Sequence, residues 1–194
     1  SSKYDQFLKG DIRLDSAGMR GLDLFLDPKK CNCNACHPTA PCNPDPSVSL
    51  FTDFSYDNLG IPRNRHLSQN QDPNHFDLGL GMNLVCEPDR DQWMGAFKTP
   101  TLRNVARKNA FMHNGYFTDL RTVLAFYARR DTHPEEWYPN SQVFDDLPSG
   151  FRANVNRSEV PMDLSLGDQP HLTEHDIDDL LAFLNTLNDG YVSP

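Results

Sequence analysis

Hydrophobic residues recur at helical spacing in three stretches of the chain, and the first stretch follows Asp15 and Ser16. Either residue can cap a helix, because a short polar side chain accepts hydrogen bonds from the free amides of the first turn. Apolar positions then repeat every three or four residues, as on one face of a helix: Met19, Leu22, Phe25 and Leu26. The pattern predicts a helix that ends near Asp27-Pro28.

The second stretch, FTDLRTVLAFYARRD, spans residues 117–131. Its apolar face is formed by Leu120, Val123, Leu124 and Tyr127. The stretch predicts a helix, and the place of Tyr127 on the apolar stripe predicts that its side chain points inward.

The third stretch, TEHDIDDLLAFLNTLNDG, begins at Thr173. Thr173 is the expected N-cap, and Glu174 and Asp176 place negative charge in the first turn, where the helix dipole favours it. The apolar stripe consists of Ile177, Leu180, Leu181 and Leu184. Gly190 is a natural stop, because glycine commonly follows the last helical turn.

Between the helices lie two long, polar, proline-rich segments, about 38–96 and 131–170. They exceed ordinary connections, and such loops are usually functional or contact something else. The length of 194 residues suits one domain. We therefore expect a single domain over 1–194 with two large insertions.

Composition and charge narrow the function classes. The net charge of −9 argues against an electrostatic nucleic-acid footprint, so no nucleic-acid partner is expected. No apolar run approaches the roughly 20 residues that span a bilayer, so no transmembrane segment is expected. The sequence begins at Ser1 without a signal peptide, and we expect a mature or trimmed product.

Four of the five cysteines lie in CNCNACHPTAPC, residues 31–42. A disulfide knot, a zinc site, a redox Cys-x-x-Cys and a covalent haem all use such cysteines. Cys33, Cys36 and His37 form C-x-x-C-H, the motif of c-type haem attachment. Two thiols at this spacing reach the vinyl groups on one porphyrin edge, and the histidine supplies a nitrogen to the iron. Zinc would need a second clean ligand pair and a thioredoxin-like site a βαβ unit, and neither is visible.

The order of the helices supports the haem reading. A helix directly before C-x-x-C-H and an amphipathic helix at the end of the chain are the layout of a haem-c domain, in which the two pack together. The sequence therefore predicts a mainly α, class I cytochrome c-like haem domain with long irregular loop insertions. It predicts one covalent haem c.

Three cysteines remain: Cys31, Cys42 and Cys86. Haem c is attached after export, so the expected location is periplasmic, extracellular or on the cell surface, where disulfides are permitted. Cys31 lies two residues before an attachment cysteine and would be strained in a bridge. We therefore favour a Cys42–Cys86 disulfide, although pairing cannot be deduced from sequence.

The ligand on the second face of the iron decides what the haem can do. The candidates are Met94, Met112, His113 and Tyr127. Methionine would raise the reduction potential and suit simple electron transfer, whereas a hard, anionic phenolate favours ferric and higher states.

Sequence stretches along nearly the whole chain resemble one family. They are KYDQFLKGD, GMRGLDLFL before CNACH, FTDFSYDNLGIPRN after it, GAFKTPTLRNVARKNAFMHNGYFTDL and LTEHDIDDLLAFLNTL. With them the chain resembles the bacterial di-haem cytochrome c peroxidases, within them the MauG-like branch, and specifically the C-terminal haem domain.

The resemblance implies an oxidoreductase built from two haem-c domains. In the family, peroxide meets the N-terminal haem, whose pocket residues are absent from this sequence. The C-terminal haem passes electrons to it or helps to stabilise a high-valent haem during peroxide-dependent oxidation. The implied partners are an N-terminal haem domain, or a second chain of the same enzyme, and a redox protein. The alternative is a stand-alone mono-haem cytochrome that transfers electrons and has no peroxidase activity.

The resemblance also implies roles for particular residues. After a turn equivalent to 112–115, the helix position taken by methionine in the peroxidases is a tyrosine in MauG-like proteins, here Tyr127; Met112 is the alternative ligand. His113 resembles a histidine near the haem and the domain junction, with a role on an electron path or as an ordinary core histidine. Arg103 is expected to pair with a haem propionate or to form a surface ion pair.

Family members bind a calcium ion between the two haems, partly through backbone carbonyls. The corresponding positions here are Lys108 and Ala110. Their side chains differ from the usual threonine and proline, but a carbonyl oxygen does not depend on its side chain. The remaining ligand would come from the other domain.

Overall fold

The computed structural model describes residues 1–39, 49–139 and 142–192. The α-helices are α1 (Lys3–Leu8), α2 (Ser16–Leu26), α3 (Cys33–Cys36), α4 (Leu80–Asn83), α5 (Leu120–Arg129) and α6 (Glu174–Asn185). The short 3-10 helices are η2 (Ser68–Gln71), η3 (Arg90–Trp93), η4 (Val105–Arg107), η5 (Pro134–Glu136) and η7 (Ser149–Asn154). The mainly α class is confirmed.

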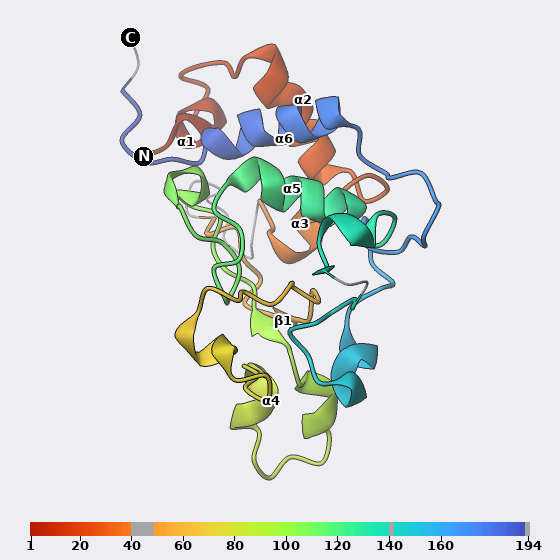
Figure 1. Ribbon diagram of the computed structural model, residues 1–194. Coiled ribbons are helices and arrows are strands. Elements are labelled where there is room, and N and C mark those ends of the chain that lie inside the picture. Colours follow the sequence, from red (N-terminus) through yellow and green to blue (C-terminus); the bar gives the residue numbers. More distant parts are fainter. Residues whose placement is uncertain (40–48, 140–141, 193–194) are drawn as a thin grey trace.

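The helices α2, α5 and α6 form a helical layer (Figure 1). Helix α2 packs along α6, as the sequence predicts, and α5 packs against α6. The two longest helices approach closely at Gly21, where an added Cβ would lie 2.0 Å from the Asp179 carbonyl oxygen. Beside this crossing, Arg20 donates two hydrogen bonds of 2.7 Å to the Asp179 carboxylate.

An aromatic cluster fills the core beneath the helical layer. Phe25 of α2 and Phe183 of α6 contact each other at 5.1 Å between ring centroids, and Tyr4 lies edge-on to Phe183 at 5.4 Å. Phe51 completes the cluster from the segment that follows α3. Phe25, Phe51 and Phe183 are almost fully buried, so this cluster contributes a large share of the apolar area removed from water.

Most helix ends agree with the sequence predictions. Asp15 caps α2 and Thr173 caps α6, where Thr173 and Asp176 form a capping box. The expected stop at Gly190 differs, because α6 ends at Asn185 and Thr186 is its C-cap. The Thr186 hydroxyl donates to the Phe183 carbonyl at 2.6 Å, which satisfies an acceptor of the last turn.

The rest of the described chain has little regular structure. We call residues 56–98 and 131–170, apart from 140–141, the loop region; most of it lies below the helical layer in Figure 1. Its strands β1 (Tyr56–Asp57) and β2 (Phe97–Lys98) pair antiparallel, with Tyr56 opposite Lys98. Within the described residues, no helix is both long and apolar enough to cross a membrane.

Candidate haem site

The C-x-x-C-H motif forms the short helix α3 and its end. Asn32 precedes it in the left-handed conformation, with φ at 50°, and turns the chain into the helix. The His37 amide donates to the Cys33 carbonyl at 2.9 Å, so the helical turn places His37 just beyond the two thiols. Cys33 and Cys36 are both free thiols, as thioether formation requires.

The orientation of His37 is fixed by one hydrogen bond. Its Nδ1 lies 2.7 Å from the Phe51 carbonyl oxygen. A carbonyl only accepts hydrogen bonds, so Nδ1 carries the proton and Nε2 keeps its lone pair. Burial lowers the pKa of His37, which also favours the neutral ring. A neutral imidazole with a free Nε2 is the form that binds iron.

Tyr127 lies on α5, near the two thiols. Burial raises the pKa of Tyr127 well above its usual range, and the potential from Cys33 and Cys36 adds to this effect. The side chain packs against the core but remains partly exposed, as the inward-facing stripe predicts. Among the described residues, its hydroxyl has no hydrogen-bond partner, so the phenol oxygen is available to a ligand beside the thiols.

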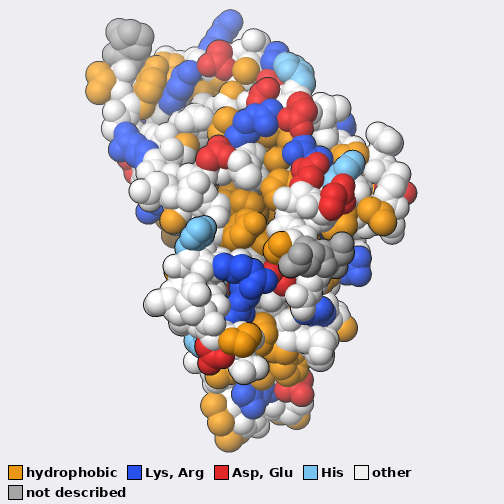
Figure 2. All heavy atoms as spheres, in the orientation of Figure 1, with side chains coloured by type: hydrophobic (Ala, Val, Ile, Leu, Met, Phe, Trp, Pro, Cys, Tyr) orange, Lys and Arg blue, Asp and Glu red, His pale blue; other side chains and the backbone are white. Residues whose placement is uncertain are grey.

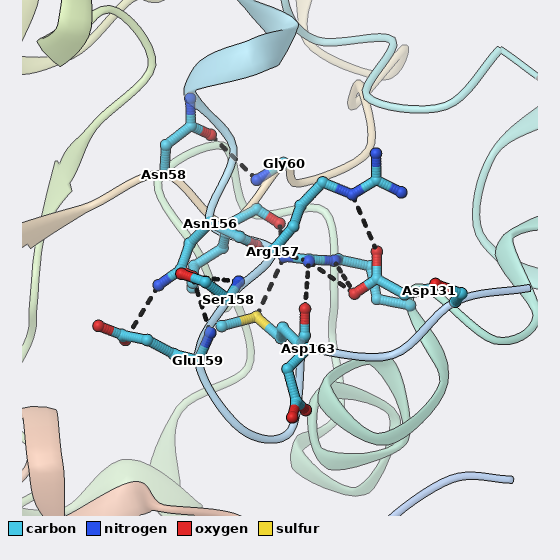
Figure 3. Close-up of polar contacts among 12 residues, drawn as sticks. Asn58, Gly60, Asp131, Asn156, Arg157, Ser158, Glu159 and Asp163 are labelled. Atoms are coloured by element: carbon cyan, nitrogen blue, oxygen red, sulfur yellow. Dashed lines mark hydrogen bonds and ion pairs between the residues drawn. The ribbon is translucent and has the colours of Figure 1, made fainter. Parts of the chain in front are cut away.

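A buried polar network holds the end of α5, one turn beyond Tyr127. The Arg130 guanidinium pairs with Asp131 at 2.6 Å and donates to the Asn156 carbonyl at 2.6 Å and to the Leu59 carbonyl at 3.1 Å. Figure 3 shows Asp131 and Asn156 at this point, with Glu159 on the outer side of Asn156, whose side-chain amide donates to it. A fully buried charge is tolerated only when it is paired and hydrogen-bonded, so this network ties α5 to the loop region.

Part of the apolar core is only half-buried. Several half-buried apolar side chains pack against it: Leu59, Leu78, Leu102, Met112 and Tyr116. Figure 2 shows hydrophobic side chains gathered in the middle of one face, between the helical layer and the loop region. Thiols, a pre-oriented imidazole, an unpartnered phenol and a flanking apolar surface together fit a covalently attached haem.

Arg103 lies at the edge of this site. Its guanidinium pairs with Asp5 at 2.7 Å and donates to the Ser49 carbonyl at 2.7 Å. The side chain is largely buried, so this is not the exposed ion pair of the alternative reading. A contact with a haem propionate stays a prediction.

Met112 and His113 lie in the turn before α5. Met112 adopts a positive φ of 66° and packs partly buried against the core. His113 stacks on Phe97, with ring centroids 3.6 Å apart, and its Nε2 lies 3.5 Å from an oxygen of Asp146. An electron-path role for His113 stays a prediction, and so does Met112 as the alternative ligand.

The positions expected to bind calcium are exposed. Lys108 and Ala110 lie between η4 and α5, and within the described ranges neither carbonyl oxygen accepts a hydrogen bond. Free carbonyl oxygens suit a hard cation. No group of three or more His, Cys, Asp or Glu side chains in the described part of the chain could hold a metal ion. Calcium stays a prediction that rests on these backbone oxygens.

The remaining cysteines leave the disulfide prediction untested. Cys86 is exposed and Cys31 is buried, and the Cys31 thiol donates to the Leu24 carbonyl at 2.8 Å. Cys42, the predicted partner of Cys86, lies outside the described residues.

Sequence reasoning missed two parts of the site. The Phe51 carbonyl carries no side-chain signal, although a bulky residue at a φ of 51° marks a constrained backbone once the structure is known. The Arg130–Asp131 pair appears in the sequence only as adjacent charges after an apolar stripe. Adjacent opposite charges are common on surfaces, so the pair gives no signal of its burial.

Comparisons with known proteins show the family to which the chain is similar. No family model matches the sequence. Methylamine utilization protein MauG of Paracoccus denitrificans is 32% identical over 198 residues, which cover 100% of this chain and 48% of that protein. A cytochrome-c peroxidase of Denitromonas iodatirespirans is 31% identical over 144 residues, 66% of this chain and 36% of that protein.

Among solved structures, the diheme peroxidase BthA from Burkholderia thailandensis superimposes with a TM-score of 0.93 at 46% identity. The match covers 97% of this chain and 46% of that one. The chain thus spans about half the length of the relatives it matches. The helix-rich fold that carries C-x-x-C-H in this chain matches part of the fold of a diheme peroxidase. The chain belongs to the MauG-like family of di-haem peroxidases.

Proposed function

We propose that this chain is the C-terminal haem domain of a periplasmic or otherwise exported MauG-like peroxidase or oxidase. One haem c is attached through Cys33 and Cys36 and ligated by His37 and Tyr127. Its fold is class I cytochrome c-like, over a single domain. The observation that carries the proposal is His37: its ring is fixed with Nε2 free, directly beyond the two thiols.

The bound haem would supply one-electron redox chemistry and, with a second haem, storage of oxidising equivalents. The chain's residues define its environment. His37 donates a nitrogen lone pair whose basicity is raised by the hydrogen bond to Phe51. Tyr127 offers a phenol oxygen from α5, and a bound metal charge would replace its proton. An oxygen ligand stabilises the ferric state, so the expected potential is low.

The partner is proposed to be an N-terminal haem domain, in the same or a second chain, that meets peroxide. Support comes from the relatives, which are about twice as long as the part matched here. A protein reductant is the second expected partner. If His37 and Tyr127 both held the iron, this domain would leave no coordination position open to peroxide and would transfer electrons instead.

The proposal is tested by mass spectrometry and peroxide kinetics on the purified chain from a host that matures haem c. The denatured mass should exceed the polypeptide mass by one haem, and the isolated chain should react only slowly with hydrogen peroxide. A polypeptide of bare mass would contradict the haem assignment. Rapid, saturable peroxide turnover would contradict the electron-transfer role.

A further inference from the structure

The backbone segment 49–51 is held at each of its three carbonyl groups. The Ser49 carbonyl accepts from Arg103 Nε at 2.7 Å, the Leu50 carbonyl accepts from the Thr101 hydroxyl, and the Phe51 carbonyl accepts from His37. The first two donors belong to a single loop. The third is the proposed iron ligand, so one loop fixes the segment that orients this ligand.

The segment is constrained as well as held. Phe51 has a φ of 51°, a left-handed conformation that is unusual for a bulky aromatic residue. Such a backbone persists only where its surroundings enforce it. The Ser49 hydroxyl donates to the Pro38 carbonyl at 2.7 Å and accepts from the Phe51 amide at 3.2 Å, which closes the turn.

Arg103 makes contacts with both sides of the segment. Its guanidinium carbon lies 5.1 Å from the centre of the Phe51 ring. Its Nη1 binds Asp5 at 2.7 Å and the Ser2 hydroxyl at 3.1 Å, both at the capped start of α1. Arg103 therefore ties the capped start of α1 to the Ser49 backbone and to the ring of Phe51, whose carbonyl accepts the hydrogen bond from His37.

We propose that Arg103, assisted by Thr101, is a positioning residue that lowers the reduction potential of the haem by fixing the Phe51 carbonyl against His37 Nδ1. A firm hydrogen bond at Nδ1 raises the basicity of Nε2, and a more basic ligand favours ferric iron. Loosening the segment weakens this bond and favours ferrous iron. The inference rests on the proposed ligation of a haem by His37.

The test is the midpoint potential of the holoprotein, measured with redox mediators, for wild type, Arg103→Lys and Thr101→Val. Lysine keeps the positive charge but loses the planar fork that grips Ser49 and Asp5 together. Arg103→Lys should shift the ratio of reduced to oxidised haem about tenfold toward reduced, which is about 59 mV for a one-electron couple. Thr101→Val should shift it in the same direction by less, and Thr101 is exposed, so folding should be retained.

The matched control is Arg20→Lys. Arg20 also holds a carboxylate with two hydrogen bonds between segments far apart in the chain, yet its partner is Asp179 of α6 and not the 49–51 segment. It should change stability without moving the potential. The low-spin g values of the ferric protein, which report ligand basicity, should change in Arg103→Lys and Thr101→Val only.

The outcomes separate the possible roles. If Arg103 acted only on a propionate, Thr101→Val would leave the potential unchanged, and that result would overturn the inference. The inference would also be overturned if Arg103→Lys and Thr101→Val both had the same midpoint potential as the Arg20→Lys control. In that case the proposed function would still stand, provided that the wild-type haem is ligated by histidine. A wild-type protein without histidine-ligated haem would overturn both.

Discussion

The helical layer and the loop region are held together by different interactions. In the helical layer, α2 and α6 bury aromatic rings such as Phe25 and Phe183, and most of its charges lie outside. In the loop region, buried charges replace much of the apolar core: Arg63 pairs with Asp146, and Asp131 pairs with Arg130 at the end of α5, all almost fully buried. Apolar packing is non-directional, whereas buried ion pairs demand defined geometry. Substitutions of polar and charged residues should therefore destabilise the loop region more than they destabilise the helical layer.

The largest expected effect comes from breaking the buried pair at the end of α5. Arg130→Met leaves the Asp131 carboxylate buried beside a methionine and should lower the free energy of unfolding by about 3–5 kcal/mol. In the helical layer, Arg121→Met removes exposed ion pairs with Glu174 and Asp178 and should cost far less stability than Arg130→Met. Urea unfolding of both holoproteins checks the contrast, and equal losses would refute it.

Substitutions that add side-chain volume should reverse the comparison, because α2 and α6 of the helical layer are packed closely against each other. Gly21→Ala pushes a methyl group against the Asp179 carbonyl and the Phe183 side chain and should cost about 1–3 kcal/mol. Gly18→Ala on the same helix would place its methyl group 3.2 Å from Asp15 Oδ1 and in ordinary contact with Leu14 and Thr186 at 3.6 and 3.9 Å, and it should be near neutral. Thermal unfolding of the two variants measures the difference. If Gly21→Ala proved as stable as Gly18→Ala, close packing of α2 on α6 would be contradicted.

The smallest expected effects are pH-dependent and have opposite signs in the two regions. Burial raises the pKa of Asp57 in the loop region, although a hydrogen bond from Asn156 acts against this. The folded pKa of Asp57 exceeds the unfolded value of about 3.9. Ionised Asp57 therefore lowers the free energy of unfolding above the folded pKa, and this loss is recovered as the pH falls and the carboxylate is protonated. At the start of α5, hydrogen bonds from Thr122 lower the pKa of Asp119. The stabilisation that Asp119 contributes to the folded protein is present above the unfolded pKa and is lost as the pH falls through the folded pKa.

Two substitutions measure these contributions. Asp57→Asn should stabilise the protein at pH 7 and steepen its loss of stability on acidification, whereas Asp119→Asn should flatten that loss below about pH 4. Urea unfolding at intervals between pH 3 and 7 follows both. An Asp57→Asn variant less stable than wild type at neutral pH would show that the buried charge is compensated in the folded state.

The same contrast explains what could be predicted from the sequence. Helices α2, α5 and α6 follow from apolar periodicity and caps such as Asp15 and Thr173, because these signals are local. The pairing of Tyr56 with Lys98 and the burial of Arg130 depend on contacts between distant segments that no local pattern encodes. The C-x-x-C-H motif could be recognised in the sequence because its residues lie within five consecutive positions.

Ligation of one haem by His37 and Tyr127 is tested most directly by the ferric absorption spectra of three proteins. Wild type should lack the sulfur-to-iron charge-transfer band of a methionine-ligated haem. Tyr127→Phe, which removes only the phenol oxygen from α5, should change the spin state, whereas Met112→Leu should leave the spectrum nearly unchanged. The reverse result, with the methionine variant altered and the tyrosine variant not, would contradict the account and identify Met112 as the ligand.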